Sequence, residues 1–205
     1  MSRILFTSRF TGDLKQPATR ESVRNMLSLE HLCFMNQTHS DRVHVVENPD
    51  IAFDCDALVT SIKGLGLAAL AADCMPITFE SSSVVGVAHV GRKGLLSGIA
   101  IKTVQTMRQL GAVKIVATVG PHVCGACYEV SPEMYREAIS VLPSSATSEE
   151  KHCLDLLAGV THQLRGLDVE VRTLGMCTLE SSHYFSYRGG DLESRQAGIL
   201  SLIHI

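Results

Sequence analysis

Residues 65–89 read LGLAALAADCMPITFESSSVVGVAH, and this stretch decides the fold. It contains three runs, Leu67–Ala71, Ile77–Glu80 and Val84–His89, that are apolar or β-branched and are bounded by Gly, Asp, Pro or Ser. Short apolar runs between such residues are typical of buried β-strands. We therefore expect the first half of the chain to be rich in strands.

Further elements follow on either side of this stretch. Similar runs predict five more strands: Leu32–Met35, Val43–Glu47, Ala57–Ser61, Val113–Val119 and Val169–Thr173. Three segments are predicted to be helices: Gly94–Leu110, Pro132–Val141 and Lys151–Leu164. Strict alternation of strand and helix is missing, so the pattern favours a layered α+β fold over a doubly wound nucleotide-binding sheet.

Length and composition describe one globular domain covering residues 1–205. Apolar residues make up 45% of the chain and charged residues 19%, as in ordinary soluble proteins. The net charge of −3 and the lack of a basic block argue against a nucleic-acid partner. The most apolar stretch, residues 65–79, is too short to span a membrane, and the first 20 residues do not fit a signal peptide. Seven cysteines, an odd number, indicate reduced thiols in a cytoplasmic protein.

Three residues with metal-binding side chains fall where predicted strands meet loops. His39 lies in a polar loop, Cys74 follows one apolar strand, and His89 ends another. Two imidazoles and a thiolate suit zinc or copper, and a set of three ligands leaves a fourth position for water or substrate. The spacing equally permits a cysteine hydrolase in which Cys74 is the nucleophile and His89 the base. Sequence separation does not choose between these interpretations.

Four cations are candidates for binding an anion: Arg92, Lys93, Arg188 and Arg195. Arg92 and Lys93 directly precede the predicted helix Gly94–Leu110, and a helix N-terminus beside cations can bind phosphate. The alternative is that the two side chains form a solvated charge pair at the start of a helix.

Cys124-Gly125-Ala126-Cys127 is a CxxC motif. A thioredoxin-like motif would stand at the start of a helix, but Ser131-Pro132 marks a helix start only four residues later. The His-x-Glu motif of zinc deaminases is also absent. We therefore favour a structural or supporting role for these cysteines over a redox role.

Five short blocks together resemble one known family. In chain order they are Gln37-Thr38-His39-Ser40; Asp56–Thr60 with Ala72–Pro76; Ala88–Gly91; Gly120-Pro121 with Cys127–Val130; and Phe185–Arg188. They are similar to motifs of the laccase-domain proteins, also called the YfiH-like or multicopper polyphenol oxidase family. Members of this family are described as purine nucleoside phosphorylases.

The resemblance implies a four-layer α/β/β/α sandwich, related to cytotoxic necrotizing factor-type toxins, with zinc on His39, Cys74 and His89. The implied activity is phosphorolysis of adenosine, inosine and methylthioadenosine, with adenosine deamination as a side activity. On this interpretation Cys74, His89 and Asp73 are the candidate catalytic residues, and Asp73 moves protons. The candidate substrate-binding residues are Gln37, Lys93 and Arg188, which would contact purine nucleosides and phosphate.

The chain departs from the family pattern next to the predicted metal site. Arg92 stands where the family motif has tryptophan, and Lys93 stands where it has arginine. Lysine lacks the two-pronged guanidinium that grips a phosphate. Three alternatives therefore stay open: a cysteine hydrolase or deamidase, a peptidoglycan-editing protein, and a non-catalytic zinc-binding protein. A polyphenol oxidase is disfavoured, because one His₂Cys site does not supply several coppers. The sequence does not fix the oligomeric state.

Overall fold

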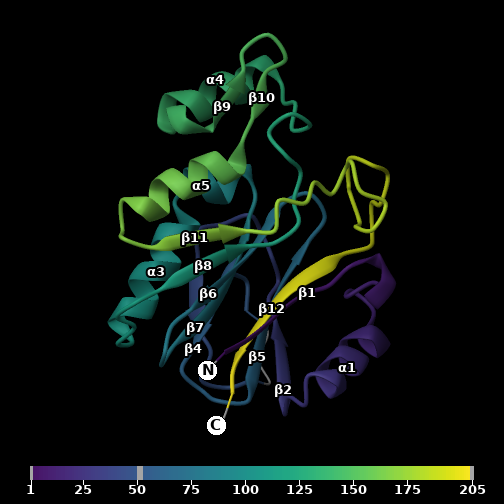
Figure 1. Ribbon diagram of the computed structural model, residues 1–205, viewed down its shortest axis with the longest axis vertical. Coiled ribbons are helices and arrows are strands. Elements are labelled where there is room, and N and C mark those ends of the chain that lie inside the picture. Colours follow the sequence, from purple (N-terminus) through teal and green to yellow (C-terminus); the bar gives the residue numbers. More distant parts are fainter. Residues whose placement is uncertain (1, 50–52, 204–205) are drawn as a thin grey trace.

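Two β-sheets lie face to face in the computed structural model, which describes residues 2–49 and 53–203 (Figure 1). The larger sheet has the strand order β11-β8-β6-β7-β4-β3 and the smaller one the order β1-β12-β5-β2. The larger sheet consists of β3 (Val43–Val45), β4 (Ala57–Thr60), β6 (Met75–Glu80), β7 (Val85–Val90), β8 (Val116–Val119) and β11 (Glu170–Thr173). The smaller sheet consists of β1 (Ser2–Phe6), β2 (His31–Phe34), β5 (Leu65–Ala71) and β12 (Gln196–Leu202).

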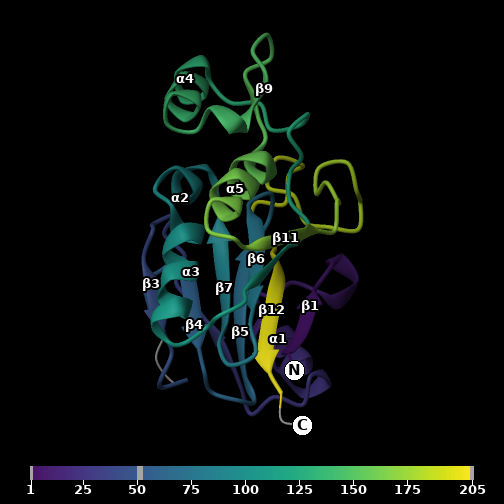
Figure 2. The same cartoon turned by 60° about the vertical axis from the view of Figure 1, so that its left-hand side comes forward.

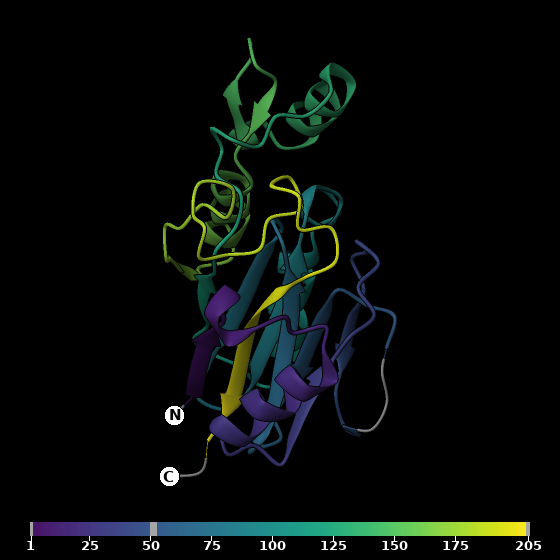
Figure 3. The ribbon, with the colours of Figure 1, turned by 90° about the vertical axis from the view of Figure 1, so that its right-hand side faces the viewer.

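Helices cover the two outer faces, so the molecule has the four layers α/β/β/α that the resemblance implied (Figures 2 and 3). The helices are α1 (Pro17–Met26), α2 (Arg92–Leu96), α3 (Ile99–Gln109), α4 (Pro132–Val141) and α5 (Leu156–Arg165). Helix α1 packs on the smaller sheet, whereas α2, α3 and α5 pack on the larger one. Helix α4 and the hairpin of β9 (Ala146–Ser148) and β10 (Cys153–Leu154) stand beyond one end of the sheets (Figures 1 and 2). Two 3-10 helices complete the set, η1 (Arg9–Thr11) and η2 (Pro143–Ser145).

The central strands of both sheets are buried on both faces, which explains why they are largely apolar along their whole length. In β5, Leu67 and Ala69 point into the core between the sheets, and Ala68 and Leu70 point toward α1. Side chains alternate between the faces of a strand, so a strand with two buried faces needs apolar residues throughout. The apolar run Leu67–Ala71 therefore lies in β5, a central strand of the smaller sheet.

All eight strands expected from the sequence are present, but two helix predictions were partly wrong. The segment expected to be one helix over Gly94–Leu110 is two helices, because Gly98 adopts a left-handed conformation with φ of 81° between α2 and α3. The segment expected to be a helix over Lys151–Leu164 begins with β10, and its helix starts only after Asp155. The Asp155 carboxylate caps that helix by accepting a hydrogen bond of 2.9 Å from the Ala158 amide.

The sequence did not lead us to expect strands β1 and β12, helix α1, the β9-β10 hairpin or the two 3-10 helices. Strand β12 is fully buried between β1 and β5 in the smaller sheet, with antiparallel pairing on both sides. Within residues 2–49 and 53–203, no helix has the length and apolar character needed to cross a membrane.

Candidate metal centre and its cavity

Strand register brings the predicted metal ligands to one end of the larger sheet. Cys74 lies where the chain leaves β5 for β6, and β6 pairs antiparallel with β7 so that Pro76 faces His89. On the other side of β7, Ala57 of β4 faces Ala88, and the His89 amide donates to the Asp56 carbonyl at 2.8 Å. The end of β7 and the starts of β4 and β6 therefore meet at the same place.

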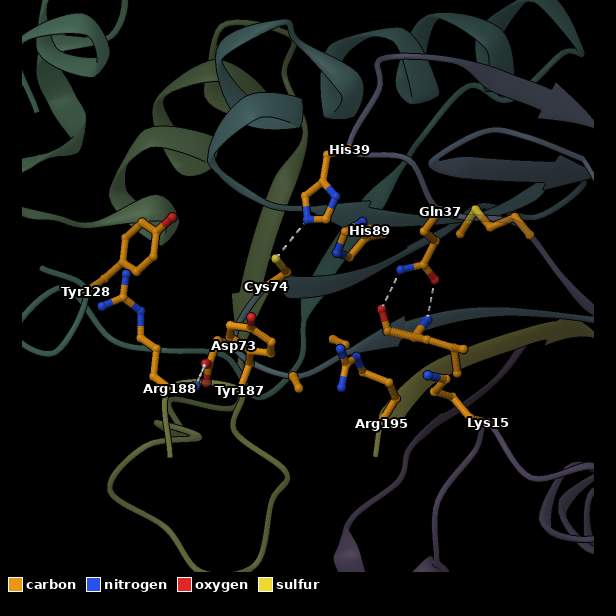
Figure 4. Close-up of a pocket in the computed structure, with 14 residues that line it drawn as sticks. Lys15, Gln37, His39, Asp73, Cys74, His89, Tyr128, Tyr187, Arg188 and Arg195 are labelled. Atoms are coloured by element: carbon orange, nitrogen blue, oxygen red, sulfur yellow. Dashed lines mark hydrogen bonds between the residues drawn. The ribbon is translucent and has the colours of Figure 1, made fainter. Parts of the chain in front are cut away.

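His39, Cys74 and His89, which we call the His–Cys–His triad, come together there. Their ligand atoms lie within 4.8 Å of one another. His39 Nε2 is 3.9 Å from Cys74 Sγ, and the two imidazole rings meet edge to face with centroids 4.8 Å apart (Figure 4). His39 is exposed, Cys74 is half-buried and His89 is buried, so the triad opens to solvent on the His39 side.

Asp56 is the residue that organises the triad, and the sequence did not reveal its role. Its carboxylate is fully buried, and its Oδ1 atom lies 2.9 Å from His89 Nδ1. The same carboxylate accepts hydrogen bonds from the backbone amides of Thr38, His39 and Ser40 at 3.1, 3.0 and 2.6 Å. The left-handed backbone of His39, with φ of 57°, lets these three successive amides converge on one anion. One buried carboxylate thus positions both histidines.

The hydrogen bond to Asp56 also decides which nitrogen of His89 can bind a metal. A carboxylate that holds the proton on Nδ1 leaves the lone pair of Nε2 free to coordinate. Burial alone would raise the pKa of Asp56, but hydrogen bonds from His89 and Ser40 hold it well below its usual range. Asp56 is therefore ionised at neutral pH, as this arrangement requires.

Cys74 and His89 influence each other's charge. Burial alone would raise the pKa of Cys74, but the adjacent His89 and the hydrogen bond to His39 lower it. Burial would likewise lower the pKa of His89, whereas the Cys74 thiolate and Asp56 raise it. The triad thus stabilises the thiolate, which is the form of cysteine that binds metals.

A glycine beside the triad keeps space for the ligands. A Cβ atom added at Gly91 would lie 2.9 Å from Cys74 Sγ and 3.1 Å from a ring carbon of His39. Because real Cβ atoms do not approach other atoms so closely, any larger residue would displace a ligand. The close ligand atoms, the carboxylate behind His89 and the glycine together fit a three-ligand zinc site with an open position.

A cavity of about 500 Å³ opens over the triad. Its lining residues are Lys15, Met35, Gln37, His39, Leu70, Ala71, Ala72, Asp73, Cys74, His89, Tyr128, Tyr187, Arg188 and Arg195. Figure 4 shows Tyr128 and Arg188 on one side, Arg195 and Lys15 on the other, and the triad between them. This volume is typical of a site for a small organic ligand.

Arg188 and Lys15 are exposed at the cavity, and Arg195 is half-buried. Its guanidinium lies 4.5 Å from the centroid of the Tyr128 ring, and its backbone amide donates to Asp73 at 2.8 Å. Lys15, which the sequence did not single out, pairs with Glu193 at 2.9 Å. Arg195 donates to backbone carbonyls of its own loop. Arg188 therefore offers the guanidinium that is least engaged by other groups.

Of the other two predicted substrate-binding residues, Gln37 lies at the cavity and Lys93 lies outside it. Lys93 is exposed on α2 and is not among the described residues that line the cavity. Its neighbour Arg92 forms an ion pair of 2.6 Å with Glu137 of α4. Gln37 lines the cavity, but its amide is used in two hydrogen bonds of 2.8 Å to the backbone of Leu70, one donated and one accepted.

Asp73 lines the cavity, and its buried carboxylate accepts three hydrogen bonds. It accepts hydrogen bonds from Thr178 and Ser186, each at 2.7 Å, in addition to the Arg188 amide. Its left-handed backbone, with φ of 83°, turns the chain from β5 toward Cys74. The arrangement gives Asp73 the geometry of a residue that positions its neighbours.

Comparisons with known proteins identify relatives of this chain. The family model described as multi-copper polyphenol oxidoreductase laccase matches residues 12–203. Purine nucleoside phosphorylase ORF3 of Streptomyces griseus is 41% identical over 198 residues, which cover 90% of this chain and 80% of that protein. A purine nucleoside phosphorylase of Corynebacterium glutamicum is 36% identical over 187 residues, covering 86% of this chain and 76% of that protein.

Two solved structures have the same fold. The YfiH protein of Bacillus licheniformis has a TM-score of 0.86 and 26% identity, with 98% of this chain and 92% of that chain covered. The Neisseria meningitidis protein NMB0706 has a TM-score of 0.86 and 25% identity, with 99% and 95% covered.

Proposed function

The chain belongs to the multi-copper polyphenol oxidoreductase laccase family, and on that premise we propose that it is a zinc-dependent purine nucleoside phosphorylase. The observation that carries the proposal is one cavity that joins a three-ligand metal site to an accessible guanidinium. The names of the Streptomyces and Corynebacterium relatives support the same activity. Adenosine, inosine and methylthioadenosine are the substrates we propose, with adenosine deamination as a side activity.

Phosphorolysis breaks the bond between C1′ of the ribose and the purine nitrogen and forms a bond between C1′ and a phosphate oxygen. The purine leaves with a proton on that nitrogen. The protein must therefore hold a phosphate dianion, orient the sugar and donate to the departing base. When bound at His39, Cys74 and His89, zinc would supply a Lewis acid at the floor of the cavity.

We assign phosphate binding to Arg188. Its guanidinium reaches the cavity from a fixed backbone, because the Arg188 amide is held by Asp73, and it stacks on the Tyr128 ring. Arginine binds phosphate oxygens in pairs, so a guanidinium held on an aromatic face is well suited to this role. Lys15 and Arg195 add positive charge on the other side of the cavity.

Tyr128 is suited to contact the base. Burial, together with the Cys74 thiolate, raises the pKa of Tyr128, so its hydroxyl keeps its proton at neutral pH. A protonated hydroxyl can donate a hydrogen bond to a purine nitrogen. For Asp73, we replace the expected proton transfer with positioning, because three donors already occupy its carboxylate.

The test is a phosphate-dependent assay with the purified, zinc-loaded protein. We expect inosine and inorganic phosphate to give hypoxanthine and ribose 1-phosphate, and the Cys74→Ala protein to lose both zinc and turnover. Cys55→Ala is the matched control, because Cys55 is buried in the core between the sheets and is not among the described residues that line the cavity. Base release that does not depend on phosphate, or full activity in Cys74→Ala, would contradict the proposal.

A cysteine hydrolase is a second candidate, because Asp56, His89 and Cys74 are aligned as in an acid–base–nucleophile triad. His39 separates the two functions. A zinc-dependent enzyme loses its metal and its activity in His39→Ala, whereas a hydrolase with a Cys–His dyad does not need that side chain. Polyphenol oxidation is not favoured, because the triad offers ligands for a single metal ion.

A further inference from the structure

A second group of metal-binding side chains lies outside the triad. We call Cys124, Cys127, Cys177 and Glu180 the three-cysteine cluster. The sulfur and carboxylate ligand atoms of these four residues all lie within 4.8 Å of one another. The first two residues belong to the segment that follows β8, and the other two belong to the loop that follows β11. Segments that are about 50 residues apart in sequence therefore bring four metal-type ligands together.

The spacing within each half of the cluster is typical of a zinc site. Cys124 and Cys127 form a C-x-x-C pair, and Cys177 and Glu180 form a C-x-x-E pair. Two short pairs of this kind, contributed by separate turns, are the usual construction of a four-ligand structural zinc site. The CxxC motif, which the proposed function does not use, is accounted for in this way.

Backbone amides already surround one of the sulfurs. The Cys124 amide donates to Cys177 Sγ at 3.3 Å. The amides of Leu179 and Glu180, two and three positions further along the chain, also favour the thiolate form of Cys177 electrostatically. Successive amides that point at one atom form an anion-binding hollow, which is a common arrangement around metal-bound sulfur. The loop is thus folded to hold a thiolate at Cys177.

The distances fit a tetrahedral ion. With zinc–sulfur bonds of about 2.3 Å, sulfur atoms in a tetrahedral site lie about 3.8 Å apart. Cys127 Sγ is 3.5 Å from Glu180 Oε1, and no pair of ligand atoms in the cluster is separated by more than 4.8 Å. Binding would therefore need movements of no more than about 1 Å. Three sulfurs and one carboxylate oxygen are a closed ligand set, unlike the triad, so the site is structural in type.

The cluster joins the two segments that form one wall of the cavity. Tyr128 directly follows Cys127, and Arg188 lies in the same loop as Cys177 and Glu180. That loop, residues 174–195, has no helix or strand, and loops of this length need added contacts to be ordered. Tyr128 and Arg188 then meet across the wall at 4.5 Å.

We propose that the three-cysteine cluster binds a structural zinc ion, which fastens loop 174–195 to the segment that carries Tyr128. The ion would order the wall of the cavity without contacting the substrate. Its binding does not depend on the proposed phosphorylase activity, but its effect on phosphate binding does.

The first test counts metal ions in a protein that has lost the triad. We expect the wild type to hold about two zinc ions per chain and His39→Ala to hold about one. Adding Cys177→Ser to His39→Ala should remove the remaining ion, whereas adding Cys55→Ala, the control in the core between the sheets, should not. If His39→Ala holds no zinc, or if the added Cys177→Ser leaves its zinc in place, the proposal is wrong.

Cobalt provides a second measurement that needs no activity. Cobalt bound by three thiolates should give the His39→Ala protein a strong sulfur-to-metal absorption in the near ultraviolet, and Glu180→Gln should weaken cobalt binding about tenfold or more. Glu180 is exposed, so this variant also covers the case in which Cys177→Ser fails to fold. Alkylation of the purified protein without reductant should label the cluster thiols only after chelation. A disulfide between two of the three cysteines would overturn the proposal.

The functional consequence is measured separately. In the Glu180→Gln enzyme with its triad zinc intact, we expect KM for phosphate to rise about tenfold with a smaller change in kcat, because Arg188 is less well held. If the zinc count is as expected and KM is unchanged, the site exists but does not order the wall. If no phosphorolysis is found in the wild type, the proposed function fails while the metal count still stands.

Discussion

Replacing Asp56 by asparagine should disable the metal site while keeping its shape. Asp56 Oδ2 accepts four hydrogen bonds, all from Thr38 and Ser40, whereas Oδ1 accepts two, from the His39 amide and His89 Nδ1. An asparagine amide cannot accept a hydrogen bond on its nitrogen. The side chain should therefore turn its NH₂ toward the Oδ1 position, where fewer donors are lost.

That orientation should lower both the stability of the protein and its affinity for zinc. The hydrogen bond from the His39 amide to a buried charge is lost, whereas the bond with His89 is reversed and kept. A lost bond of this kind costs about 1.5–3 kcal/mol, so the free energy of unfolding should fall by about this amount. In a protein of this length such a loss lowers the melting temperature by roughly 3–12 °C. His89 Nδ1 must also become the acceptor, which places the proton on Nε2 and removes the lone pair needed by zinc. Removing a group that supports a metal ligand typically lowers metal affinity by roughly 10- to 100-fold. We expect the affinity for zinc to fall by at least this much.

The assay combines thermal unfolding of the metal-free protein with zinc competition against a chromophoric chelator. Asp54→Asn is the matched control, because Asp54 is two residues away and exposed, and its carboxylate accepts a hydrogen bond of 3.2 Å from the Asn36 side chain. The reasoning is refuted if Asp56→Asn melts and binds zinc like Asp54→Asn. A protein that is destabilised but binds zinc normally would refute the tautomer argument alone.

Three further predictions concern the ligands and the cations. Gly91→Ala should weaken zinc binding about tenfold or more in the chelator assay, because its Cβ would lie 2.9 Å from Cys74 Sγ. Arg188→Ala should raise KM for phosphate by about 10- to 100-fold, because Arg188 lines the cavity. Lys93→Ala should change KM by less than about twofold, because Lys93 is not among the described residues that line it. Equal effects of the two variants on steady-state kinetics would contradict this assignment. Zinc should stay bound at pH 7 and be released as the pH falls toward about 5, because protons compete for the Cys74 thiolate and for His89; metal analysis after dialysis at each pH measures this.

The sequence predicted those elements whose own residues show a pattern of burial. Most of the eight strands were found because they are buried on both faces, which leaves a continuous apolar signal in each run. Helix α1 was missed because Val23 is its only fully buried residue, so its apolar periodicity is weak. Strand β12 is fully buried, but its place depends on pairing with β5, about 130 residues earlier in the chain. No local pattern reports a partner at that distance.

The same distinction holds for the site. Ligand types and strand ends made His39, Cys74 and His89 candidates, because metal chemistry is a property of single side chains. The resemblance to the laccase-domain family was needed to imply that the three bind zinc. The role of Asp56 depends on the register between β4 and β7, which the sequence does not give. One signal was available, since Asp56 is a lone acid directly before the apolar run of β4. Lys15 enters the cavity from the N-terminal segment, and Lys93 was assigned to phosphate from its position before a helix alone.

Asp73 connects the two halves of the site. Its left-handed backbone brings Cys74 to the end of the larger sheet, and its carboxylate holds the Arg188 amide together with Ser186 and Thr178. Any shift of this residue would therefore move a metal ligand and the proposed phosphate-binding residue at the same time. Such coupling would fix the distance between a metal bound at the triad and a phosphate bound at Arg188. The proposed phosphorolysis would depend on that distance, because a displacement of about 1 Å can cost about 100-fold in rate. The buried acid next to Cys74 is thus better explained by the need to hold two subsites in register than by proton transfer.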